Sequence, residues 1–107
     1  MTTAYAVAPV TQETFLPHLD KTFNVLNCDV AVELKLTEVV DSTRGRPWPP
    51  KLPKPFMLIF NGPPERILME GMRVLKASTG EMFQLYVIPI LTHDPGTTGQ
   101  QYQVIFN

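Results

Sequence analysis

The chain has 107 residues, the size of one domain of about 50 to 200 residues, which leaves no room for a two-domain enzyme. Hydrophobic residues make up 44% and charged residues 18%, so the chain can fill a core, and disorder of the whole is excluded. The net charge of -1 gives no electrostatic reason to bind nucleic acid or an anionic membrane. We therefore expect one domain over residues 1–107, with neither of these as a partner.

The N-terminal residues do not read as a signal peptide, because no positive charge precedes the short apolar stretch at residues 4–8. The single Cys28 cannot form an intramolecular disulfide, and a reducing compartment is the simplest fit. The apolar run at residues 83–91 is far shorter than the roughly 20 residues of a membrane helix. We expect the protein to be cytoplasmic as synthesised.

The N-terminal third predicts a short helical turn followed by a β-hairpin. The helical turn covers residues 11–16, is capped by its first residue and is stopped by Pro17. A strand is expected over residues 22–26, and turn-forming residues 27–29 connect it to a strand over residues 30–37. Alternation in the second strand, with Val30, Val32, Leu34 and Leu36 on one side, indicates that one of its faces is buried.

Four more strands are predicted in the remainder, over residues 56–60, 72–77, 82–90 and 101–106. Gly62, in the turn after the first of them, is expected to supply a positive φ. Parallel pairing would need crossover helices that the sequence lacks. We therefore expect an all-β fold, a small antiparallel six-stranded barrel or sandwich with a short N-terminal helical turn.

The alternation also predicts which side chains form the core. Apolar residues at inward positions of the predicted strands should be buried. They are Phe23, Val32, Leu34, Leu36, Leu58, Phe60, Phe83, Leu85, Val104 and Phe106.

Residues 41–55 form the one long irregular segment, and they hold five of the 11 prolines. Four basic residues against one acidic residue give the segment a charge of +3, which leaves -4 on the other 92 residues. The prolines favour an extended, polyproline-like path, and Arg44 with Pro47 and Pro50 fits the pattern R-x-x-P-x-x-P. The candidate partner-binding residues are Arg44, Arg46, Trp48, Lys51 and Lys54. The alternative is a rigid connector whose Trp48 folds back on the barrel.

No constellation of catalytic or metal-binding residues is recognisable. His18 and His93 lie in separate turn regions, and an ordinary surface or turn role is expected for both. Cys28 has acidic neighbours and no adjoining basic residue, which disfavours a reactive thiolate. The sequence contains no CxxC, HExxH or EF-hand spacing. We expect no enzymatic activity, no cofactor and no metal.

Landmarks along nearly the whole chain resemble a bacterial family of small uncharacterised all-β domains. They are FLP at 15–17, FNV at 23–25, VELKLTEV at 32–39, PFMLIFNGP at 55–63, LMEG at 68–71, FQLYVIPI at 83–90 and YQVIFN at 102–107. Genes of this family often lie beside those of phage tail-collar-type proteins, so the resemblance implies a tail-associated or accessory β-domain. The chain departs from the family in having Met72 after Gly71, where an aromatic residue is usual, and in its longer basic, proline-rich segment.

Together these observations predict a non-enzymatic protein-interaction or structural accessory module associated with a phage-tail-like system. Its partner would be a protein, with a tail-collar-type protein as the first candidate. The alternative function is a β-barrel that binds a small hydrophobic ligand. A dry cavity above about 300 Å³ would favour the ligand, and a filled interior would favour the interaction module.

Overall fold

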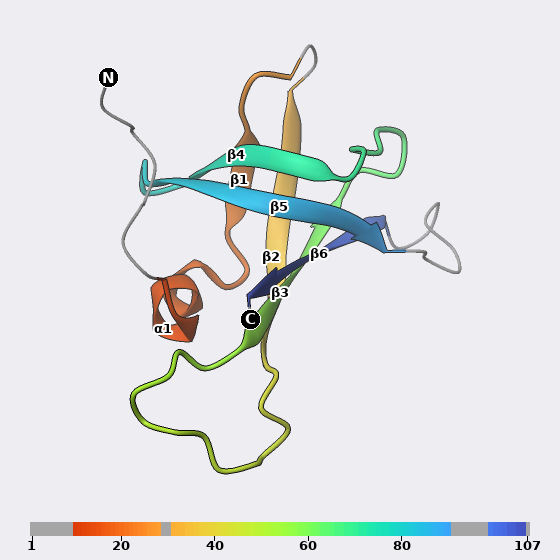
Figure 1. Cartoon of the computed structure of the whole chain (residues 1–107). Helices are drawn as coiled ribbons and strands as arrows, with labels where there is room; N and C mark the ends of the chain where they lie inside the picture. The colour runs from red at the N-terminus through yellow and green to blue at the C-terminus, as the bar shows by residue number, and fades with distance from the viewer. Residues whose placement is uncertain (1–9, 29–30, 91–98, 107) are drawn as a thin grey trace.

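The strands form one closed antiparallel barrel in the order β1-β2-β3-β6-β5-β4, with β4 returning to pair with β1 (Figure 1). The computed structural model describes residues 10–28, 31–90 and 99–106. Its elements are α1 (Gln12–Phe15), η1 (Leu16–His18), β1 (Thr22–Val25), β2 (Val32–Asp41), β3 (Phe56–Gly62), β4 (Gly71–Ala77), β5 (Met82–Ile90) and β6 (Gln100–Phe106). The all-β six-stranded antiparallel fold is confirmed, and the closed sheet makes it a barrel.

β2 differs most from its predicted bounds, because it continues to Asp41 instead of ending at residue 37. The register between β2 and β3 shifts between Leu36 and Glu38, which marks a bulge at Thr37. The Thr37 hydroxyl donates a hydrogen bond of 3.1 Å to the carbonyl of Ile59. The bulge changes the phase of the alternation, so the pattern that predicts the first half of β2 does not carry through to its end. The predicted start at Val30 lies outside the described residues.

The N-terminal helical segment continues through Pro17 instead of stopping there. Thr11 is the N-cap of α1 as predicted, and its backbone N–H donates to Thr14 Oγ1 at 3.0 Å. Pro17 lies in the first turn of the 3₁₀ helix η1, where a missing N–H leaves no helical hydrogen bond unmade. Together α1 and η1 give seven helical residues.

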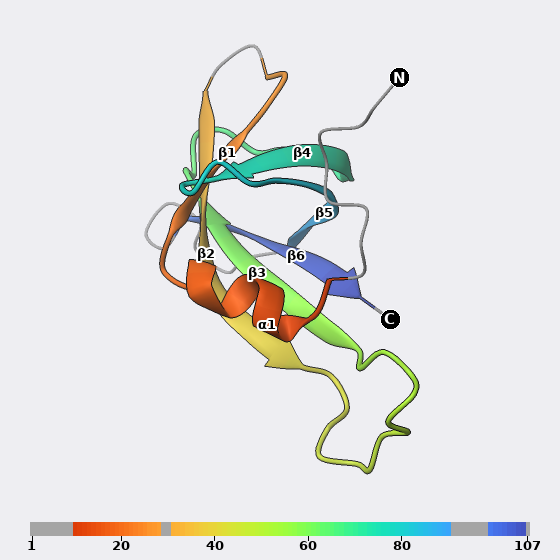
Figure 2. The same cartoon turned by 90° about the vertical axis from the view of Figure 1, so that its left-hand side faces the viewer.

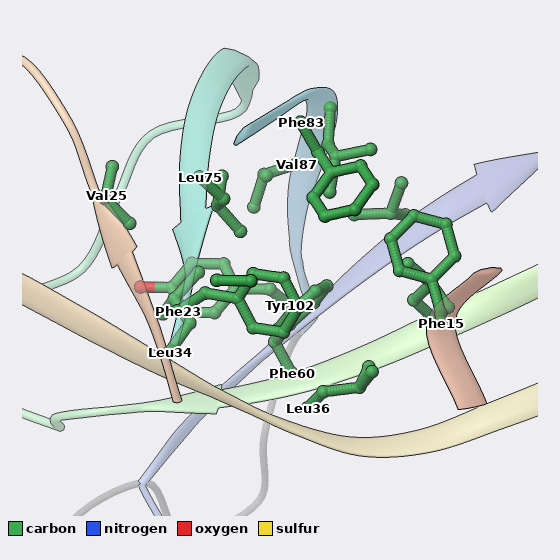
Figure 3. Packing of buried hydrophobic residues seen from close by; sticks show 14 of the residues in the cluster. Phe15, Phe23, Val25, Leu34, Leu36, Phe60, Leu75, Phe83, Val87 and Tyr102 are labelled. Atoms are coloured by element: carbon green, nitrogen blue, oxygen red, sulfur yellow. The ribbon is translucent and has the colours of Figure 1, made fainter. Parts of the chain in front are cut away.

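The barrel interior is filled by aromatic and aliphatic side chains from every strand and from α1 (Figure 3). Nine of the ten predicted core residues are buried. Phe106, at the end of β6, is the exception and is only partly buried. Its ring stacks on Phe56 with centroids 4.4 Å apart. The strand phase is therefore correct, and the exposure of Phe106 follows from its place at the rim of the barrel.

Phe15 closes the end of the barrel at which β5 and β6 separate. These two strands pair only between Ile88–Ile90 and residues 101–103, so most of their length is not joined. Phe15 is fully buried, and its ring centroid lies 5.0 Å from that of Phe83 and 5.8 Å from that of Phe106. Figure 2 shows α1 lying across this end of the barrel. The helix therefore supplies core volume that the strands alone do not.

Tyr102 and Gly62 organise the core near the segment before β4. The backbone N–H of Leu68 donates to the Tyr102 hydroxyl at 2.8 Å, and burial raises the pKa of this phenol. Gly62 lies inside β3, contrary to its predicted role as a turn residue with positive φ. A Cβ there would lie 2.7 Å from Leu34 Cδ2 and 3.2 Å from the Tyr102 ring. The position therefore needs a glycine for close packing.

We expect Phe15→Ala to lower the free energy of unfolding by about 3 to 5 kcal/mol, because it leaves a cavity between three phenylalanine rings. Leu16→Ala, at the next position with 46% of the residue exposed, is the control and should change stability little. Denaturant unfolding of both variants gives the comparison. Equal midpoints for the two variants would contradict the role of Phe15.

We expect Tyr102→Phe to cost about 1 to 3 kcal/mol, because the buried Leu68 N–H loses its acceptor while the ring remains. Tyr86→Phe is the matched control, since Tyr86 is 45% exposed and water can replace its hydroxyl. Thermal unfolding of the two variants measures the difference. A Tyr102→Phe midpoint equal to that of Tyr86→Phe would show that the Leu68 hydrogen bond contributes nothing.

Candidate interaction site

The basic, proline-rich loop of residues 42–55 connects β2 to β3 and extends beyond the end of the barrel (Figure 1, at the bottom of the picture). Asp41 and Phe56 form the last pair of the β2–β3 ladder. Immediately beyond it the Ser42 N–H donates to the Pro55 carbonyl at 3.0 Å, so the ends of the loop are held together. The loop thus leaves the barrel through a hydrogen-bonded neck.

Hydrogen bonds within the loop fold it into turns. The Arg46 N–H donates to the Thr43 carbonyl at 3.2 Å, and both residues between them have positive φ, 59° at Arg44 and 74° at Gly45. Two successive positive φ values are typical of a type I′ turn. A second turn is closed by the Leu52 N–H on the Pro49 carbonyl at 3.1 Å. The expected extended, polyproline-like path is therefore wrong at these two turns.

Trp48 makes a hydrogen bond across the loop. Its indole N–H donates to the Pro53 carbonyl at 3.0 Å, and the residue is partly buried. Among the described residues, the core cluster and the side chains packed against it do not include Trp48. The indole therefore joins the two arms of the loop.

The four predicted basic residues are all exposed and lie on both arms of the loop. Arg44 and Arg46 precede Trp48, and Lys51 and Lys54 follow it. The Arg46 Nε–H points at the Thr43 carbonyl at 3.5 Å, which is a long contact. The structure thus gathers all five predicted partner-binding residues on one projecting loop.

A pocket of about 350 Å³ lies where the loop meets the start of α1. Its walls combine apolar groups with Glu13, Asp41 and Lys54, and the apolar members include Val10 and Leu52. No local sequence pattern predicts this pocket, because its walls come from the separate segments 10–13, 41 and 52–54. The pocket lies outside the barrel interior.

Asp41 anchors the neck of the loop. Hydrogen bonds from the Thr43 side chain and backbone lower the pKa of its carboxyl group, and Lys54 and Gln12 act in the same direction. The Thr43 N–H bond to Asp41 Oδ1 is 2.8 Å long. The carboxylate therefore stays ionised at neutral pH and holds the first turn of the loop.

The two histidines and the cysteine were also considered as functional residues, and the structure describes His18 and Cys28. His18 ends η1 but is 3% exposed, so of the expected surface or turn role the surface part is wrong. Its ring contacts Phe23 and Phe83 edge-on. Its Nε2 lies 3.3 Å from Glu81 Oε1. Cys28 is a free thiol that packs against the core. His93 lies outside the described residues.

Within residues 10–28, 31–90 and 99–106, no group of three or more His, Cys, Asp or Glu residues is placed to hold a metal ion. In the same ranges no helix is long and apolar enough to cross a membrane.

We expect Asp41→Ala to speed the amide exchange of Thr43 several-fold, because this N–H loses its acceptor. The contribution of Asp41 has a defined pH dependence. Its pKa is lower in the folded chain, so stabilisation is present at neutral pH and is lost as the pH falls below about 4 toward the folded value. Glu38→Ala, on the exposed face of the same strand, is the control. Unchanged Thr43 exchange in Asp41→Ala would contradict this anchoring role.

Comparison with known proteins assigns the chain to a family without assigning an activity. No curated protein and no solved structure matches the chain. Nothing in these comparisons links it to phage tail proteins. The model of the domain of unknown function DUF6916 matches residues 10–106, nearly the whole chain, and the protein therefore belongs to the DUF6916 family.

Proposed function

We propose that this domain is a non-enzymatic protein-interaction module that presents the loop of residues 42–55 to an acidic surface of a partner protein. The observation that carries the proposal is the construction of the loop. It projects from a filled barrel, its own hydrogen bonds fold it, and four exposed cations flank a single tryptophan in the sequence.

Preorganisation of the loop supports this function. The neck at Ser42 and Pro55, the two turns and the Trp48 hydrogen bond restrict the loop before any partner arrives. A restricted loop loses less conformational entropy on binding. Tryptophan and arginine are also the residue types most often found at energetic hot spots of interfaces.

The basic side chains of the loop orient an acidic partner as it approaches. The loop carries four cations and no acidic residue between residues 42 and 55, whereas the whole chain has a net charge of -1. Such segregation steers an acidic partner toward this end of the molecule and raises the association rate. Loop residues 42–55 also hold no His or Cys, so a role in binding suits them better than acid–base or nucleophilic chemistry.

A tail-collar-type protein of a phage-tail-like system remains the first candidate partner. This choice of partner rests only on the family resemblance of the sequence. The accessory role proposed for the domain rests on the same resemblance. The location, cytoplasmic as synthesised, likewise stays a prediction.

Binding of a small hydrophobic ligand is the second candidate function. The pocket of about 350 Å³ is larger than the volume of about 300 Å³ that would favour a ligand. It lies at the foot of the loop, however, and charged groups form part of its walls. Figure 3 shows the barrel interior occupied by side chains such as Phe23, Phe60 and Tyr102. A filled interior and a mixed polar pocket favour the interaction module.

The test is binding of the purified domain to the tail-collar-type protein of the same genome, measured by surface kinetics at several salt concentrations. We expect Trp48→Ala to speed dissociation and weaken binding by tenfold or more, since a hot-spot truncation costs about 2 kcal/mol. The paired change Lys51→Gln and Lys54→Gln should mainly slow association and reduce its salt dependence.

Lys21→Gln with Lys35→Gln is the matched control, because it removes the same charge from exposed positions outside the loop. The control should leave the salt dependence of association nearly unchanged. Full affinity of Trp48→Ala, together with equal effects of the two lysine pairs, would remove the loop from the interface. Absence of binding by the parent domain would exclude the tail-collar-type protein as its partner.

A further inference from the structure

The outer face of β4 and β5 carries several apolar side chains that are exposed or partly exposed. Met72 is 56% exposed and Tyr86, directly opposite it in the ladder, is 45% exposed. Val74 and Ile88 lie at outward positions of the same two strands and are partly exposed. The exposed polar residue Gln84 lies on the same side, opposite Val74. We call Met72, Val74, Tyr86 and Ile88 the β4–β5 face.

The neighbouring strands β1 and β2, of which β1 pairs with β4, have a polar outer face. Outward positions of β1 are Thr22 and Asn24, and those facing them on β2 are Lys35 and Glu33. These positions are polar, as expected for a face in contact with water. The β4–β5 face therefore differs from the outer face of β1 and β2, whereas β3 and β6 also carry apolar outward residues, with Met57 opposite the 48% exposed Ile105.

Charge is distributed unevenly along the β4–β5 face. Glu70 stands just before β4, and Tyr86 donates to its carboxylate at 2.7 Å, which places this acid on the outer side. Lys76 stands at the other end of β4, exposed on the same side. One edge of the face is thus acidic and the other is basic, with Met72 and Val74 between them.

This order of charges is self-complementary under a two-fold axis. When two copies of β4 face each other in antiparallel directions, Glu70 of each copy meets Lys76 of the other, and Met72 meets Val74. In a symmetric dimer one patch is used by both subunits, so such reciprocal pairing is its geometric requirement. Homodimer interfaces are also more apolar than the average protein surface.

We propose that the β4–β5 face binds a second copy of this chain, with the two β4 strands antiparallel across a two-fold axis. The face lies across the upper half of Figure 1, away from the loop of residues 42–55. Dimerisation through it leaves both loops exposed. The inference is independent of the proposed function, since it concerns a different surface and is tested on the protein alone.

Sedimentation equilibrium over a concentration series provides the first test. The parent protein should show a reversible monomer–dimer equilibrium. Met72→Asp should weaken it at least about tenfold, because each dimer loses two apolar contacts. Leu52→Asp is the matched control, since Leu52 is 55% exposed but lies in the loop, and it should dimerise like the parent. Circular dichroism checks that each variant is folded.

Charge exchange provides the second test, because it reports the orientation. Glu70→Lys and Lys76→Glu should each weaken the dimer by placing like charges together at both ends of the face. The double variant should restore it. A parent protein that is monomeric up to its solubility limit, a dimer indifferent to Met72→Asp, or a double variant weaker than both single variants would each overturn the proposal.

Discussion

The packing of α1 against the divergent ends of β5 and β6 is the contact on which the rest of the structure depends. The β5–β6 ladder is limited to Ile88–Ile90 and residues 101–103, so backbone pairing alone does not seal the barrel. The Phe15 side chain occupies this opening and touches rings from three strands. Without it those rings would meet solvent, which is why a helix of four residues matters to a sheet of six strands.

Closure of the barrel determines where binding groups can be presented. Because side chains fill the interior, exposed groups lie on the connecting loops and on the outward positions of the strands. The loop of residues 42–55 begins where the β2–β3 ladder ends. The hydrogen bond between Ser42 and Pro55 holds the two ends of the loop together directly beyond that ladder. The pocket at its foot arises because α1, which plugs the same end of the barrel, lies beside the loop.

The two proposed surfaces would reinforce each other. A dimer through the β4–β5 face would carry two copies of the basic loop, and a partner with repeated acidic sites could engage both. Bivalent binding increases apparent affinity without any new contact, provided that both loops reach their sites. Weak individual loop contacts would then suffice for stable attachment to a symmetric assembly.

Sequence determined the features that depend on neighbouring residues. Alternation predicts β5 with its observed bounds and the inward phase of Leu34 and Leu36, because side-chain direction in a strand repeats every two residues. Only the tertiary structure decided barrel closure through β1 and β4, the burial of His18 and the continuation of β2 past its bulge. These features depend on contacts between distant segments, whose energies no local pattern contains. The composition of the loop could likewise be predicted, whereas its turns depend on hydrogen bonds within the loop, and its pocket depends on α1 lying beside it.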